Sequence, residues 1–176
     1  DTLSLGDKTL EFIFTPWVHW PETISTYAQE DKVLFSCDFF GAHVADDGGE
    51  VCTLDFEKVE AGAKRYYAEI MMPFRRMIQG HLKKLEKYEI DMIAPSHGPV
   101  DCAPEFIINA YGKWVADDVD DLVIIPYISM HGSTKKMVAY LANSLKKKGV
   151  KKVVSFNLTE TDVGELAMAL VDAATV

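Results

Sequence analysis

The chain has 176 residues, and 18 Lys and Arg stand against 27 Asp and Glu, which gives a formal net charge of −9. With 48% apolar and 26% charged residues, the composition is that of a globular protein and excludes disordered, collagen-like and coiled-coil classes. So acidic a chain is unsuited to nucleic acid, whose phosphates are neutralised by Lys and Arg. No apolar stretch approaches the roughly 20 residues that span a membrane. We therefore expect no nucleic-acid partner, no membrane partner and a cytoplasmic location.

Short runs rich in β-branched and aromatic residues predict strands in the first hundred residues. They are residues 2–5, 8–15, 32–36 and 90–94. A Gly6-Asp7 turn joins the first two, and Asp46-Asp47-Gly48-Gly49 marks another turn.

Apolar residues at helical spacing predict the helices of the same region. One pattern starts at Asp55, a candidate N-cap, and runs to about Tyr88, with Pro73 expected to break or kink it. A second helix begins at Pro104, since proline is tolerated in a first turn, and ends near residue 116. Methionines 71, 72 and 77 are expected to fill the core, and His81 is expected to be a surface or packing residue.

The acidic run over residues 116–121 indicates a boundary between two domains, residues 1–117 and 118–176. Beyond it, strands and helices alternate and predict a parallel sheet. The predicted elements are a strand over 122–128, a helix over 133–148, a strand over 152–157, a helix over 161–172 and the opening of a strand at 173–176. Because the chain begins at Asp1 without methionine and stops where a strand opens, we expect an internal piece of a longer protein.

Cys37, Cys52 and Cys102 are the cysteines of the chain, an odd number without a CxxC pair. Neither a zinc ribbon nor a disulfide framework fits this spacing. The cysteine pattern therefore favours a reducing compartment.

A loop rich in hydroxyl groups joins the predicted strand at 122–128 to the helix that follows it. Its residues are Ser129, Met130, His131, Gly132, Ser133 and Thr134. A helix N-terminus attracts anions through its free N–H groups, and Ser and Thr hydroxyls add donors. Neither GxxxxGK[ST] nor GxGxxG occurs, so the pattern leaves two interpretations open, a monophosphate site or an ordinary turn with an N-cap.

The segment Ile-Pro-Tyr-Ile-Ser-Met-His-Gly-Ser-Thr-Lys-Lys-Met resembles the FMN phosphate loop of the flavodoxin family, in the variant found in flavodiiron proteins. The resemblance implies that residues Ser129 to Thr134 wrap the FMN phosphate.

Three predicted strands of the first region each lead to a possible metal ligand. They lead to His19, to Asp38 and to His97, respectively. Imidazole nitrogen and carboxylate oxygen suit Fe, Zn or Mn, and one carboxylate can bridge two ions. Taken singly, each residue has a structural interpretation as well, as a packing residue or a turn residue. His43 is expected to have a loop or supporting role.

The motifs Thr-Pro-Trp-Val-His-Trp-Pro-Glu-Thr, Leu-Phe-Ser-Cys-Asp-Phe-Phe-Gly and Ala-Pro-Ser-His-Gly-Pro resemble, in order, three motifs of the metallo-β-lactamase-like domain of flavodiiron proteins. The resemblance implies that His19 binds one iron, Asp38 bridges both irons and His97 binds the other. The family's remaining ligands come from an HxExD-type motif upstream, and no such motif occurs in this chain. The implied α/β fold is the C-terminal part of a metallo-β-lactamase-like αββα domain followed by the start of a flavodoxin-like domain.

The same resemblance implies an enzyme that reduces O2 to water, or NO to N2O, at a diiron centre with electrons from FMN. It implies an electron donor such as rubredoxin or reduced coenzyme F420, and a head-to-tail homodimer or a dimer of dimers. Two other classes stay open. One is a metallo-β-lactamase-fold hydrolase fused to a flavodoxin-like module, and the other is an electron carrier in which only the flavin domain works.

Overall fold

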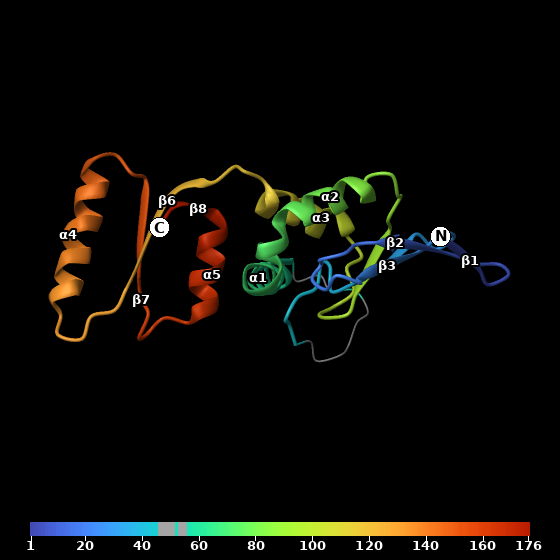
Figure 1. The fold of residues 1–176 in the computed structure, drawn as a ribbon, viewed down its shortest axis with the longest axis horizontal. Coiled ribbons are helices and arrows are strands. Elements are labelled where there is room, and N and C mark those ends of the chain that lie inside the picture. Colours follow the sequence, from blue (N-terminus) through green and yellow to red (C-terminus); the bar gives the residue numbers. More distant parts are fainter. Residues whose placement is uncertain (46–51, 53–55) are drawn as a thin grey trace. The chain divides into compact units, whose positions relative to one another are not determined.

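The structure, a computed structural model, describes residues 1–45, 52 and 56–176. The chain divides into two compact units, residues 1–116 and 117–176, and each is described by itself (Figure 1). The turn expected at 46–49 and the N-cap expected at Asp55 lie outside the described residues. Among the residues that the structure describes, no helix is both long and apolar enough to cross a membrane.

The first unit contains a five-stranded sheet with the order β1-β2-β3-β4-β5. The strands are β1 (Thr2–Ser4), β2 (Thr9–Phe14), β3 (Ile24–Ala28), β4 (Val33–Cys37) and β5 (Met92–Pro95). The strands predicted at 2–5, 8–15, 32–36 and 90–94 are confirmed, whereas β3 was not predicted. Neighbours are antiparallel from β1 to β4, and β5 is parallel to β4. Hence β2, β4 and β5 run in the same direction.

The two faces of this sheet differ in exposure. Ile13, Leu34 and Ile93 are buried on one face, at 6%, 0% and 0% exposure. Because side chains alternate along a strand, the neighbouring residues point to the opposite face. That face carries Phe14, Ile24 and Phe35, all exposed.

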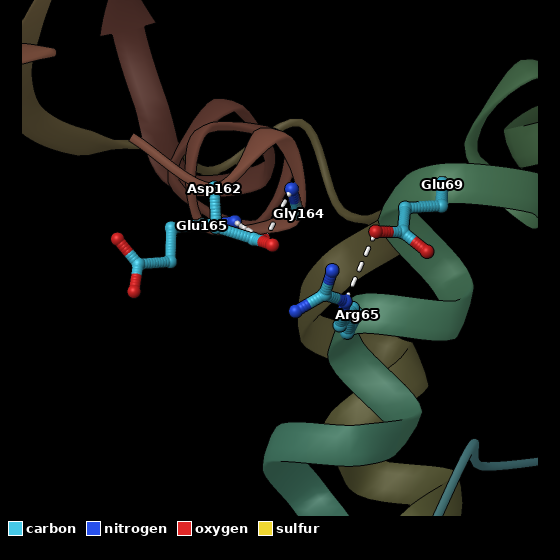
Figure 2. Close-up of polar contacts among 5 residues, drawn as sticks. All are labelled: Arg65, Glu69, Asp162, Gly164 and Glu165. Carbon is cyan, nitrogen blue, oxygen red and sulfur yellow. Dashed lines mark hydrogen bonds and ion pairs between the residues drawn. The ribbon is translucent and has the colours of Figure 1, made fainter. Parts of the chain in front are cut away.

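The helical segment of the first unit changes its type midway. It comprises α1 (Phe56–Tyr66), a π-helical stretch η1 (Tyr67–Met71), a 3-10 turn η2 (Met72–Phe74) and α2 (Arg75–Leu85). The predicted break at Pro73 is confirmed, since η2 separates α1 and η1 from α2. Arg65 in α1 donates to Glu69 at 3.0 Å, one turn later (Figure 2). Met71 is fully buried as expected, but the expectation for Met77 is wrong, because that side chain is 44% exposed.

α3 (Pro104–Val115) begins at the proline that the sequence marks as its start. Its buried side chains include Ile107, Tyr111 and Trp114. The rings of Phe39 and Phe40 meet Tyr111 edge-on, with centroids 5.4 and 5.1 Å away. An aromatic core therefore joins α3 to the segment that follows β4.

The second unit is a parallel sheet with the order β7-β6-β8. Its elements are β6 (Asp120–Tyr127), α4 (Ser133–Lys147), β7 (Lys152–Asn157), α5 (Val163–Asp172) and β8 (Ala173–Thr175). β7 and β8 are both parallel to β6, which confirms the prediction of alternating strands and helices. α4 connects β6 to β7 on one side of it, α5 connects β7 to β8 on the other side of β6, and the two helices lie on opposite faces of the sheet (Figure 1).

α5 begins with a side-chain cap. The Oδ1 of Asp162 accepts hydrogen bonds from the backbone N–H groups of Gly164 at 2.8 Å and Glu165 at 3.3 Å (Figure 2). These bonds satisfy two of the donors that a helix N-terminus leaves open.

Candidate functional site

The sheet of the first unit brings three candidate ligands to one edge. β2, β4 and β5 run in the same direction, so their carboxyl ends lie at the same edge of the sheet. His19 follows β2, Asp38 follows β4 directly, and His97 follows β5 by two residues. Residues separated by 78 positions in the sequence are therefore neighbours in space.

The carboxylate of Asp38 lies between the two imidazoles. His19 Nε2 is 3.4 Å from Asp38 Oδ2, and His97 Nε2 is 3.3 Å from Asp38 Oδ1. Each oxygen therefore faces a different ring. The Asp38 side chain is only 13% exposed, against 26% for His19 and 46% for His97.

Backbone hydrogen bonds hold the loop of Asp38 to the loop of His97. Ser96 N–H donates to the Cys37 carbonyl at 2.8 Å, and Ala42 N–H donates to the His97 carbonyl at 3.1 Å. Gly98 has φ +84°, and a Cβ there would lie 2.6 Å from the Ala42 carbonyl oxygen. The close approach of the two loops therefore requires glycine at position 98.

The loop that carries His19 is fixed at both of its ends. Thr15 N–H donates to the Thr23 carbonyl at 3.0 Å, which extends the pairing of β2 with β3. Within the loop Val18 is fully buried. His81 on α2 lies with its Nε2 2.8 Å from the Pro16 carbonyl oxygen, three residues before His19.

His81 is 5% exposed, so of its two expected roles the structure gives it packing. Its Nδ1 is buried without a hydrogen-bond partner, which fits a neutral ring that donates from Nε2. Burial lowers the pKa of His81, and the nearby charge of Lys84 lowers it further, while the bond to Pro16 raises it.

Aromatic side chains surround the imidazole of His97. The ring of His43 meets it edge-on, with centroids 5.6 Å apart, and the ring of Tyr66 lies 5.7 Å away. The ring centroids of His43 and Tyr66 are 4.6 Å apart. Burial, and then the Asp38 carboxylate, raise the pKa of the Tyr66 hydroxyl, which stays protonated at neutral pH. The sequence patterns did not single out Tyr66 as a site residue, because its contacts with His43 and His97 are made by the tertiary fold.

The chemistry of these donors fits metal ions in part. Two ligands bound about 2.1 Å from one tetrahedral ion lie about 3.4 Å apart, close to the separations of Asp38 from His19 and from His97. The arrangement is two pairs that share a carboxylate. Among the described residues, no group of three or more His, Cys, Asp or Glu is arranged to hold a metal ion. Each ion would therefore need further ligands.

The hydroxyl-rich loop of the second unit follows the central strand β6. Gly132 has φ +80° and lies just before α4, and Ser129 Oγ accepts from Lys135 N–H at 3.2 Å. His131, Ser133 and Thr134 lie at the surface, and Met130 is 87% exposed. In open α/β sheets ligands bind outside the carboxyl ends of the strands, and this loop lies at the carboxyl end of the central strand β6.

One covalent feature was not foreseen. Cys52 and Cys102 form a disulfide, while Cys37 is free. The expectation from cysteine spacing was wrong for this pair, because cysteines 50 positions apart are brought together only by the tertiary fold.

Comparison with known proteins gives matches along the chain. Residues 1–98 match the family model described as ODP family beta lactamase. The coenzyme F420H(2) oxidase of Methanothermobacter marburgensis is 36% identical over 189 residues, which cover all of this chain and 44% of the relative. The anaerobic nitric oxide reductase flavorubredoxin of Salmonella typhi is 36% identical over 171 residues, 94% of this chain and 36% of the relative.

Among solved structures, rubredoxin oxygen:oxidoreductase from Desulfovibrio gigas superposes with a TM-score of 0.89 at 28% identity, covering 98% of this chain and 44% of that chain. The chain thus spans less than half the length of these relatives. It belongs to the ODP family of beta-lactamase-like domains and, with these relatives, to the flavodiiron proteins.

Proposed function

We propose that this chain is part of a flavodiiron oxidoreductase that reduces O2 to water, or NO to N2O. The observation that carries the proposal is the position of Asp38, whose two carboxylate oxygens face two different imidazoles at one sheet edge. A carboxylate in that position suits two cations held side by side. Two irons held by these residues would supply the redox chemistry and the binding site for the small substrate, with FMN as the source of electrons.

The roles of the chain's own residues follow from their surroundings. His19 and His97 would each offer an imidazole nitrogen to one ion, and Asp38 would offer its carboxylate to both. The rings of His43 and Tyr66 pack around His97 and restrict its orientation. His81 holds the loop of His19 through the Pro16 carbonyl.

The second part of the proposal assigns the loop Ser129, Met130, His131, Gly132, Ser133 and Thr134 to the phosphate of FMN. It is supported by the left-handed Gly132, by the accessible hydroxyls at the start of α4 and by the position of the loop after the central strand. Residues 118–176 are then the start of a flavodoxin-like domain, and residues 1–117 belong to the metallo-β-lactamase-like domain.

The partners are proposed from the relatives. Their names identify coenzyme F420H(2) and rubredoxin as electron donors and oxygen and nitric oxide as substrates. We extend these classes to this protein, together with a cytoplasmic location and a head-to-tail dimer that brings the flavin of one subunit near the irons of the other.

The metal part is tested by iron content. The full-length protein reconstituted anaerobically with Fe(II) should hold two irons per chain. Because Asp38 serves both ions, Asp38→Asn should lose both, whereas His97→Asn should lose mainly one. Asp31→Asn is the matched control, since Asp31 lies in an exposed pair with Lys8, and it should retain both irons. Full iron content in Asp38→Asn contradicts the proposal.

The flavin part is tested by titration with FMN. Loss of a hydroxyl donor to a charged phosphate costs about 1.5–3 kcal/mol, so Ser133→Ala should weaken FMN binding about tenfold or more. Ser155→Ala, an exposed position on β7, is the control and should bind FMN like the parent protein. Equal affinities in the two variants contradict the assignment of the loop.

A further inference from the structure

The disulfide between Cys52 and Cys102 lies close in the chain to the candidate ligand His97. The two Cα atoms are 5.6 Å apart, and 50 residues separate the cysteines in the sequence. Cys102 follows the turn that begins with His97 and Gly98 after β5. The disulfide therefore ties a distant segment to the end of that turn.

Backbone pairing makes this turn a closed unit. Ile93 N–H donates to the Asp101 carbonyl at 2.9 Å, and Asp101 N–H donates to the Ile93 carbonyl at 2.8 Å. Cys52 forms a parallel bridge with Val100 on the other side. The stretch from Val100 to Cys102 thus lies between β5 on one side and Cys52 on the other. The disulfide adds a covalent bond on the side of Cys52.

The Asp101 side chain adds to the rigidity at this point. Its Oδ1 accepts from Ala103 N–H at 2.9 Å, and its Oδ2 is buried without a hydrogen-bond partner. The residue is 9% exposed. Burying an unpaired polar atom costs free energy, which the packing around Asp101 has to offset.

The two residues of the disulfide differ in exposure. Cys102 is exposed, whereas Cys52 is only partly so. Cys102 also lines a surface hollow of about 680 Å³ together with Asp91, Pro104 and Phe106. A small thiolate or a protein thiolate can therefore approach the Sγ of Cys102.

We propose that Cys52 and Cys102 form a reversible redox-modification site that controls the rigidity of the turn carrying His97. In the opening direction the thiolate of a dithiol attacks the Sγ of Cys102, and Cys52 leaves as a thiol after taking up a proton. The second thiol of the reductant then resolves the mixed disulfide, so that two cysteine thiols and one oxidised dithiol result. In the closing direction one hydrogen peroxide oxidises the two thiols to the disulfide and yields two waters.

The disulfide can open and close whether or not the proposed function is correct. Its effect on a metal ligand, His97, rests on the proposed function. Opening the disulfide removes the only covalent tie of the 100–102 stretch to a distant segment among the described residues. Backbone hydrogen bonds then hold the turn closed, among them the pair between Ile93 and Asp101.

Alkylation of the full-length protein tests the pairing. After treatment with oxidised glutathione, denaturation in N-ethylmaleimide without reductant should leave Cys52 and Cys102 unlabelled, and reduction with dithiothreitol before labelling should label both, as read from the peptides that contain them. Peptide mapping should show Cys52 joined to Cys102. Cys37→Ser should keep the joined peptide, and Cys102→Ser should lose it. Labelling of both Cys52 and Cys102 without reduction would overturn the proposal.

Amide hydrogen exchange tests the link to the turn without any metal or activity measurement. The amides of Ile93 and Asp101 should exchange about tenfold faster after reduction, while those of β7 in the second unit should be unchanged. Equal rates for Ile93 and Asp101 in the two redox states would overturn the control of the turn. Iron content decides the proposed function separately, so the two failures are distinguishable.

Discussion

Gly98 allows the loops of Asp38 and His97 to approach, and its replacement tests that contact. In Gly98→Ala the new Cβ meets the Ala42 carbonyl oxygen at 2.6 Å in a left-handed residue. We expect a loss of about 3 kcal/mol in the free energy of unfolding, of which about 1–2 kcal/mol is the cost of a left-handed alanine.

Gly6→Ala separates the two contributions, because Gly6 has φ +100° and a Cβ at this position would have no neighbouring atom within 4 Å. The free energy of unfolding of Gly6→Ala should fall only by the cost of a left-handed alanine, about 1–2 kcal/mol. Urea unfolding of both variants gives the comparison, and equal losses would show that the Ala42 contact has no energetic weight.

The buried imidazole of His81 predicts a pH dependence of stability. Its folded pKa is lowered by burial from an ordinary value of 6.5, so the unfolded chain binds the proton more tightly. The stability that the neutral ring provides is therefore complete above pH 6.5 and is lost progressively as the pH falls from 6.5 to the lowered pKa.

His81→Gln keeps a donor for the Pro16 carbonyl but cannot titrate. The decrease in unfolding free energy between pH 7.5 and 5.5 should be smaller in this variant than in the parent protein, and His131→Gln, at an exposed position, should behave like the parent. An identical pH dependence in all three proteins would contradict a neutral, buried His81.

At the level of the elements, the Asp162 cap of α5 should make a measurable contribution to the free energy of unfolding. Asp162→Ala removes the acceptor of the Gly164 and Glu165 N–H groups and should cost about 1 kcal/mol of stability. Glu160→Ala changes an exposed side chain two residues earlier and should change stability by less than about 0.5 kcal/mol. Chemical denaturation followed by far-UV circular dichroism makes the comparison, and equal effects would contradict the cap.

Elements with a clear pattern were predictable and mixed ones were not. β2, β4 and β5 are apolar runs that end next to polar residues, so both the strands and the ligands after them could be found in the sequence. β3 was not predicted, because its buried face carries the polar Ser25 and its exposed face carries the apolar Ile24. Such a strand shows no contrast between its two faces.

Contacts between residues far apart in the sequence also could not be predicted from sequence patterns. His81 lies on an amphipathic helix, and its bond to Pro16 spans 65 residues. The ring contacts of Tyr66 with His43 and His97 likewise depend on packing. Convergence of His19, Asp38 and His97, by contrast, follows from strand direction once the order of the sheet is known.

At the scale of the whole molecule, the disulfide should stabilise the first unit. Closing a loop of 50 residues reduces the entropy of the unfolded chain by an amount worth about 4 kcal/mol at 25 °C. Cys102→Ser should therefore unfold about 4 kcal/mol more easily than the oxidised parent protein, and the difference should largely vanish in dithiothreitol. Cys37→Ser, which leaves the disulfide intact, is the control, and a difference that persists under reduction would contradict the entropic account.

The proposed function joins both units, since the metal ligands lie in the first and the FMN loop in the second. Anaerobic stopped-flow mixing of the full-length, iron- and FMN-loaded, reduced protein with O2 and with NO, separately, tests it most directly. The account predicts rapid FMN reoxidation with consumption of at least one gas, and loss of that reaction in Asp38→Asn but not in Asp31→Asn. Hydrolysis of a thioester or lactam without consumption of either gas, or full activity in Asp38→Asn, would contradict it.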